Sequence, residues 1–163
     1  MADGYTRHHF DFDTLPWLTS PRRQLELRGV ALGLIKLPAD QGYTFTHQHR
    51  EQEEVYIVVD GNGEMLLDGK REPLGRGDIV RVDPATKRAL KAGPDGLFVI
   101  CAGAVPAGFP KHPDSRYLID DGIPDYADIP PWYQGDETVV ENNARLKRRM
   151  LAAEKRRAEK KKS

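Results

Sequence analysis

The sequence predicts an all-β protein, an antiparallel sandwich or barrel, with a helix at its C-terminal end. Short runs rich in β-branched or large apolar residues recur between residues 25 and 104, and turn-forming residues separate them. No helical period lies between these runs. Regularly spaced short strands of this kind are typical of β-sandwiches and barrels. At 163 residues the chain is long enough to bury a core as one domain.

Five runs are expected to form strands of this barrel. They are "VALGLIKL" (30–37), "EVYIVVD" (54–60), "GEMLLDG" (63–69), "DIVRV" (78–82) and "LFVICA" (97–102). Glycine-containing segments between them favour turns: "DGNG" (60–63), "DGK" (68–70), "GRGD" (75–78) and "AGPDG" (92–96). The run from Val55 to Val59 is apolar at both parities, so we expect that neither face of this strand lies in water.

Three further segments flank the barrel, which we place at residues 25–105. Residues 1–24 are expected to form an N-terminal arm. Residues 106–136 are rich in Pro and Asp and are expected to wrap the surface irregularly. Residues 137–163 predict a basic α-helix with a frayed end. Its apolar residues recur at helical spacing: Val139, Leu146, Met150 and Ala153.

Composition and charge restrict the class of protein. The net charge is zero, but residues 136–163 carry ten Lys/Arg against five Asp/Glu, which leaves the rest of the chain mildly acidic. The basic helix has no interleaved aromatics, so a solvated or subunit-contacting helix is favoured over nucleic-acid binding.

No apolar run is long enough for a membrane span, and the N-terminus shows no secretory pattern. The single cysteine, Cys101, excludes an internal disulfide. We expect a cytoplasmic protein.

The segment "THQHREQEE" (46–54) predicts a metal site. On a strand, His47 and His49 point to the same face. Glu54 shares the parity of Tyr56 and faces the barrel interior if residues 50–53 fold the chain back. Two imidazoles and one carboxylate make a facial triad, which suits one divalent ion of Fe, Mn, Ni or Zn.

Two segments resemble the motifs of the cupin family. "GYTFTHQHREQEEVYIVVDG" (42–61) is similar to the first cupin motif, although Gly42 lies one residue closer to the histidines than the pattern asks. "PLGRGDIVRVDPATKRA" (73–89) looks like the second motif. The resemblance covers residues 25–105. It implies an antiparallel jelly-roll barrel of six to eight strands, usually a homodimer, with a metal or small-molecule site inside.

The second motif departs from the pattern of metal-binding cupins. The histidine that this motif usually supplies is replaced by Ala89, beside Arg88. The segment "PATKRALKAGPDG" (84–96) resembles a cupin branch without a general assigned activity. Four alternatives remain open for Arg88: it opposes a dication, pairs with Glu54 in a metal-free pocket, anchors an anionic substrate, or is a solvated turn residue.

Two functions follow from this interpretation. The first is a metal-dependent enzyme, a dioxygenase, a sugar or sugar-phosphate isomerase, or a lyase or decarboxylase, with Arg88 and Tyr56 binding the substrate. The second is a non-catalytic small-ligand-binding or sensory cupin without metal, because no general base can be named. Glu51 and Glu53 are expected to be solvated turn residues, and Cys101 a small buried hydrophobe rather than a nucleophile.

Overall fold

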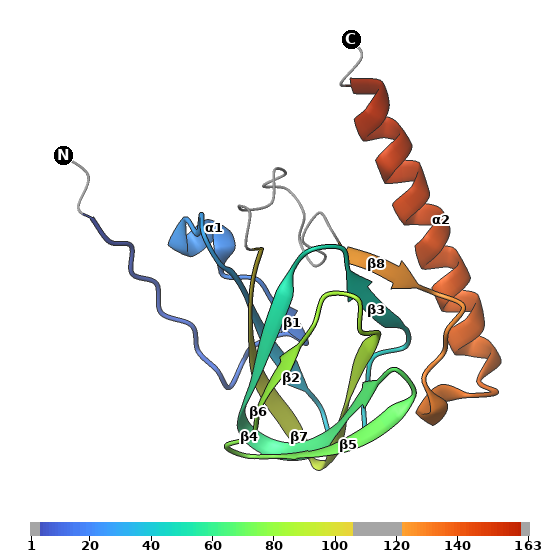
Figure 1. Ribbon diagram of the computed structural model, residues 1–163, viewed down its shortest axis with the longest axis horizontal. Coiled ribbons are helices and arrows are strands. Elements are labelled where there is room, and N and C mark those ends of the chain that lie inside the picture. The colour runs from blue at the N-terminus through green and yellow to red at the C-terminus, as the bar shows by residue number, and fades with distance from the viewer. Residues whose placement is uncertain (1–3, 106–121, 161–163) are drawn as a thin grey trace.

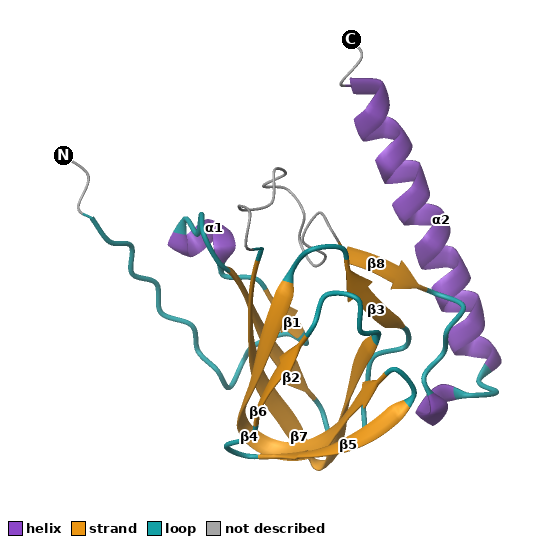
Figure 2. Ribbon diagram, viewed as in Figure 1, coloured by secondary structure: helices purple, strands orange, loops and turns teal. Residues whose placement is uncertain are grey.

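The structure, a computed structural model, describes residues 4–105 and 122–160. Antiparallel strands curl around one core, and a long helix lies outside them (Figures 1 and 2). The elements in chain order are β1 (Leu18–Thr19), α1 (Arg22–Leu25), β2 (Ala31–Leu37), β3 (Thr46–His49), β4 (Glu53–Leu67), β5 (Lys70–Gly75), β6 (Ile79–Val82), β7 (Arg88–Ala104), β8 (Gly122–Asp125), the 3-10 helix η1 (Pro131–Tyr133) and α2 (Glu137–Lys160). The predicted all-β class with a C-terminal helix is confirmed.

β4 and β7 form the framework of the barrel. β7 pairs with β2, β3 and β4, whereas β4 pairs with β5, β6 and β7, always antiparallel. Burial alternates along β4, where Glu54, Tyr56 and Val58 are buried and Val55 and Ile57 are half-buried, as a strand with one face in the core requires. The core consists mainly of large aliphatic residues: Ile35, Leu37, Val58, Met65, Leu74, Val82, Leu90, Leu97 and Val99.

Two segments that predict turns lie inside long strands instead. β4 continues through residues 60–63 and β7 through residues 92–96. The ladder between the two strands shifts register between Val58 and Asp60 and again between Gly61 and Gly63. The glycines therefore mark bulges at which both strands bend around the core, because a bulge and a reversing turn require similar backbone freedom.

The N-terminal segment reaches the edge of the sheet. β1, which lies in the predicted arm of residues 1–24, pairs with β2 through Leu18↔Ile35. Phe12 packs its ring against Phe98, with centroids 4.9 Å apart. Among the residues described, no helix combines the length and the apolar character that crossing a membrane requires.

The C-terminal segment is tied to the strand that carries the histidines. β8 pairs with β3 along its length, so residues 122–125 of the segment that we expect to wrap the surface form a short strand; residues 106–121 lie outside the described part. The short run "GIPD" has no strand pattern, and its conformation comes from pairing with β3.

Side chains of the C-terminal segment reinforce this attachment. Asn143 on α2 is 2% exposed and donates a hydrogen bond to the carbonyl of Thr44 at 2.8 Å. Trp132 Nε1 donates to the carbonyl of Tyr43 at 3.0 Å. The start of α2 is thereby fixed beside the segment leading into β3, and the rest of the helix projects beyond the barrel (Figure 1).

Gly61 lies at the bend of β4 in a conformation that favours glycine. Its φ is +77°, and a Cβ added there would lie 2.2 Å from the carbonyl oxygen of Gly96 on β7. Gly69, in the turn between β4 and β5, has a similar φ of +86° but has no atom within 4 Å of an added Cβ. The two glycines share the backbone requirement, and only Gly61 is also restricted by space.

Replacing these glycines separates the two effects. We expect Gly69→Ala to destabilise the protein by roughly 1–2 kcal/mol, the cost of a left-handed conformation for an L-residue. Gly61→Ala should cost about 3 kcal/mol or more, because the backbones of β4 and β7 must also separate. Urea unfolding followed by circular dichroism measures both. Equal losses in the two variants would show that the contact with Gly96 is unimportant.

Candidate functional site

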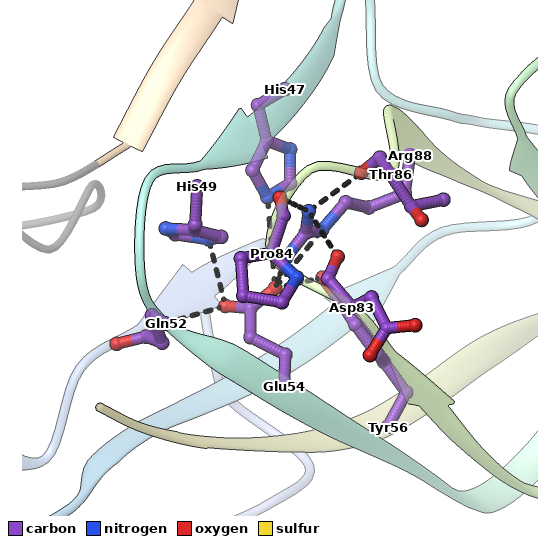
Figure 3. Close-up of polar contacts among 9 residues, drawn as sticks. All are labelled: His47, His49, Gln52, Glu54, Tyr56, Asp83, Pro84, Thr86 and Arg88. Atoms are coloured by element: carbon purple, nitrogen blue, oxygen red, sulfur yellow. Dashed lines mark hydrogen bonds and ion pairs between the residues drawn. The ribbon is translucent and has the colours of Figure 1, made fainter. Parts of the chain in front are cut away.

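The candidate ligands meet where three strands begin or end. β3 carries His47 and His49, Glu54 lies at the start of β4, and Arg88 is the first residue of β7. His47 is the residue of β3 that pairs with Arg88 across the β3–β7 ladder. The turn between β3 and β4 folds the chain back, so that both histidines and Glu54 point into the same space (Figure 3).

The three ligand atoms converge within the protein. One ligand atom of each residue, an imidazole nitrogen or a carboxylate oxygen, lies within 4.8 Å of the other two. His49 Nε2 is 3.2 Å from Oε1 of Glu54, and His47 Nε2 is 3.9 Å from Oε2. The His49 side chain is 2% exposed and that of His47 11%, so His47 is the more accessible imidazole. The structure thus brings together the residues that the spacing pattern predicts.

Glu54 is the centre of the cluster. Its Oε1 accepts a hydrogen bond from Gln52 Nε2 at 3.0 Å. Its Oε2 accepts one from the Tyr56 hydroxyl at 2.6 Å and two from Arg88, from Nε at 3.2 Å and from Nη2 at 3.0 Å (Figure 3). This carboxylate is 7% exposed, and every contact stabilises its ionised form.

Arg88 is buried, so its interpretation as a solvated turn residue is wrong. It is 1% exposed and pairs with Glu54. Its Nη1 donates to the carbonyls of Pro84 at 3.0 Å and Thr86 at 2.6 Å, with a longer contact of 3.5 Å to that of Asp83. One guanidinium therefore binds the Glu54 carboxylate and also fixes the turn before β7, which the forked geometry of arginine permits.

The pKa values of the cluster follow from burial and pairing. Burial alone would raise the pKa of Glu54, but hydrogen bonds from His47 and His49 outweigh it and hold this pKa well below its ordinary range. Burial lowers the pKa of His47, and the hydrogen bond and charge of Glu54 only partly oppose this shift. At neutral pH the cluster therefore holds an ionised carboxylate and a neutral His47 imidazole.

Gln52 is a member of the cluster that the motif spacing does not single out. It is fully buried, and a Cβ added at Gly103 on β7 would lie 2.6 Å from its Nε2. Gly103 therefore provides the space in which the Gln52 amide reaches Glu54. The sequence does contain an indication of this role, because Gln52 has the same strand parity as Glu54 and Tyr56.

Other candidates lie as the sequence predicts. Glu51 and Glu53 are exposed and outside the cluster. Cys101 is 8% exposed, and burial raises the pKa of its thiol, which disfavours a nucleophilic thiolate. Ala89, at the position of the usual histidine, is buried at 1% exposure. Two surface hollows of about 410 and 370 Å³ have linings that include none of the three candidate ligands.

The cluster predicts a loss of stability in acid. The pKa of Glu54 is below its ordinary 4.5 in the folded protein, so the stabilisation by its carboxylate is present above that pH and is lost as the pH falls. The pKa of His47 in the folded protein is below 6.5. Below pH 6.5 the imidazole of His47 therefore binds a proton in the unfolded chain more readily than in the folded protein, which favours unfolding. We expect the unfolding free energy of metal-free protein to fall from about pH 6.5 downward. Glu54→Gln should reduce the pH dependence of the unfolding free energy below about pH 4.5. Urea titrations at several pH values measure this; parallel curves for the two proteins would contradict it.

Comparisons with known proteins identify relatives of this chain. The family model for the cupin domain matches residues 33–103. An uncharacterized protein of Methanocaldococcus jannaschii is 29% identical over 76 residues, which are 46% of this chain and 58% of that protein. The matched region thus spans less than two thirds of that relative's length.

Solved structures show the same architecture. A cupin protein from Bacteroides fragilis aligns with a TM-score of 0.59 and 25% identity, over 69% of this chain and 96% of that one. An RmlC-like cupin protein from Desulfovibrio desulfuricans aligns with a TM-score of 0.52 and 19% identity, over 61% of this chain and 97% of that one. The curled antiparallel sheet is therefore a jelly-roll barrel, and the chain belongs to the cupin superfamily.

Proposed function

We propose that His47, His49 and Glu54 hold one divalent metal ion inside the barrel, and that this ion binds a small molecule at its open positions. The convergence of the three ligand atoms within 4.8 Å carries the proposal. Two imidazoles and one carboxylate leave positions free on an octahedral ion and suit Fe, Mn, Ni or Zn. A bound ion of this kind supplies Lewis acidity, or activation of oxygen where the ion is redox-active.

The chemistry of the cluster fits a metal. Ligation requires a deprotonated carboxylate and a neutral imidazole, and these are the forms that burial and pairing favour for Glu54 and His47. Metal-ligating carboxylates are usually held by outer hydrogen bonds. Gln52, Tyr56 and Arg88 supply such bonds to Glu54.

The reaction proposed for this site belongs to the classes that the cupin resemblance implies: dioxygenation, isomerisation of a sugar or sugar phosphate, or decarboxylation or lyase chemistry. In this proposal Arg88 and Tyr56 line the substrate side of the ion. We assign no general base, because both polar groups already bind Oε2 of Glu54.

The contact between Arg88 and Glu54 favours a second candidate, a non-catalytic small-ligand or sensory cupin without metal. The guanidinium neutralises the carboxylate that a metal would need, and a like charge nearby raises the cost of binding a dication. The same cluster would then hold an organic ligand directly.

Metal content separates the two candidates. We expect untagged protein to contain nearly one equivalent of a transition metal by inductively coupled plasma mass spectrometry, and the His47→Ala/His49→Ala variant to contain almost none, because two of its three ligands are gone. The exposed pair in His8→Ala/His9→Ala is the matched control and should retain the metal. A metal-free wild type, even after incubation with Fe(II), Mn(II), Ni(II) and Zn(II), would reject the first candidate and leave the second.

A further inference from the structure

The cluster contains two opposite charges that cancel. Glu54 contributes one negative charge and Arg88 one positive charge, whereas Gln52 and Tyr56 contribute none. An imidazole must be neutral to ligate a metal, so His47 and His49 add no charge to the metal-bound site. The nearby Asp83 adds no negative charge to the cluster, because its carboxylate pairs with Arg81 at the surface and only its carbonyl contacts Arg88. Adding a divalent ion would leave this buried site with two uncompensated positive charges.

Arg88 cannot withdraw when an ion enters. Its guanidinium is always protonated in proteins, so it cannot lose its charge. The carbonyls of Pro84 and Thr86 hold Nη1, and the side chain is 1% exposed. Moving it into water would break these bonds and open the turn before β7. The positive charge therefore stays beside the ion.

One carboxylate cannot neutralise both cations. An ion that binds Glu54 draws electron density from the oxygen atoms that Arg88 and Tyr56 contact at 3.0 and 2.6 Å. The Nε–Nη2 edge of Arg88 then lacks a full counter-charge inside the protein, where an uncompensated charge is unfavourable. A second anion at the ion's open position would supply further counter-charge to both cations.

We propose that the site binds its divalent ion together with a small anionic ligand, a carboxylate or phosphate group, and that Arg88 couples the two binding events. This inference rests on the proposed metal site and specifies its ligand class. By linkage the anion tightens metal binding by the same factor as the metal tightens anion binding. In the absence of a suitable anion, Arg88 keeps the affinity for metal low.

Calorimetric titration of Zn(II) into metal-free protein tests the coupling. Acetate and perchlorate, at equal ionic strength, serve as a coordinating and a non-coordinating anion. For the wild type we expect binding to tighten about tenfold or more in acetate. Acetate in free solution competes for the ion and weakens apparent binding, so a tightening can only arise in the site. This measurement needs no variant.

The Arg88→Gln variant tests the assigned residue. Without the guanidinium, Zn(II) should bind about tenfold more tightly than to the wild type in perchlorate, and the gain from acetate should largely disappear. Arg88→Lys keeps the charge and should keep the acetate effect. Lys87→Gln removes a neighbouring cation whose partners are Asp125 and Asp128 at the surface, and should behave as the wild type does. Circular dichroism establishes that each variant is folded.

Three results would count against these proposals in distinguishable ways. Equal wild-type affinities in acetate and perchlorate would overturn the coupling while leaving the metal site intact. A full acetate effect in folded Arg88→Gln would overturn the role of Arg88. No Zn(II) binding by the wild type or by any Arg88 variant in either salt would reject the metal site itself, and the coupling with it.

Discussion

The buried contact between Arg88 and Glu54 is the interaction on which the arrangement of the site depends. It joins the beginnings of β4 and β7, and the remaining donors of Arg88 fix the turn that precedes β7. Burying either charge alone would cost several kcal/mol, so each requires the other. The positions of Gln52 and Tyr56 follow from the same carboxylate, whose lone pairs they satisfy.

The sequence locates the three candidate ligands because their relation is local. Alternation along a strand aligns His47 with His49, and a short turn returns Glu54 to the same face. The partner of Arg88 was not predictable in this way. Arg88 lies 34 residues from Glu54, and its direction depends on the register of β7 and on the carbonyls of the preceding turn. Sequence alone therefore left four alternatives for this residue.

The class of the fold can be predicted from the sequence. Single elements are mispredicted or missed where the local sequence fits more than one backbone conformation. Glycine-rich segments at residues 60–63 and 92–96 satisfy both a reversing turn and a bulge, and only the pairing of β4 with β7 decides between them. β8 has neither alternation nor β-branched density sufficient to predict a strand. It forms because the edge of β3 offers backbone donors and acceptors.

The pairing of β8 with β3 also covers the edge of the strand that carries the histidines. An uncovered strand edge presents a row of backbone hydrogen-bonding groups that another chain can join. β3 meets β7 at a single pair, His47↔Arg88, and its other side would be open without β8. The C-terminal segment thus gives the histidine-bearing strand a partner from its own chain, and the four-residue β8 takes the place of β3 at the edge of the described sheet.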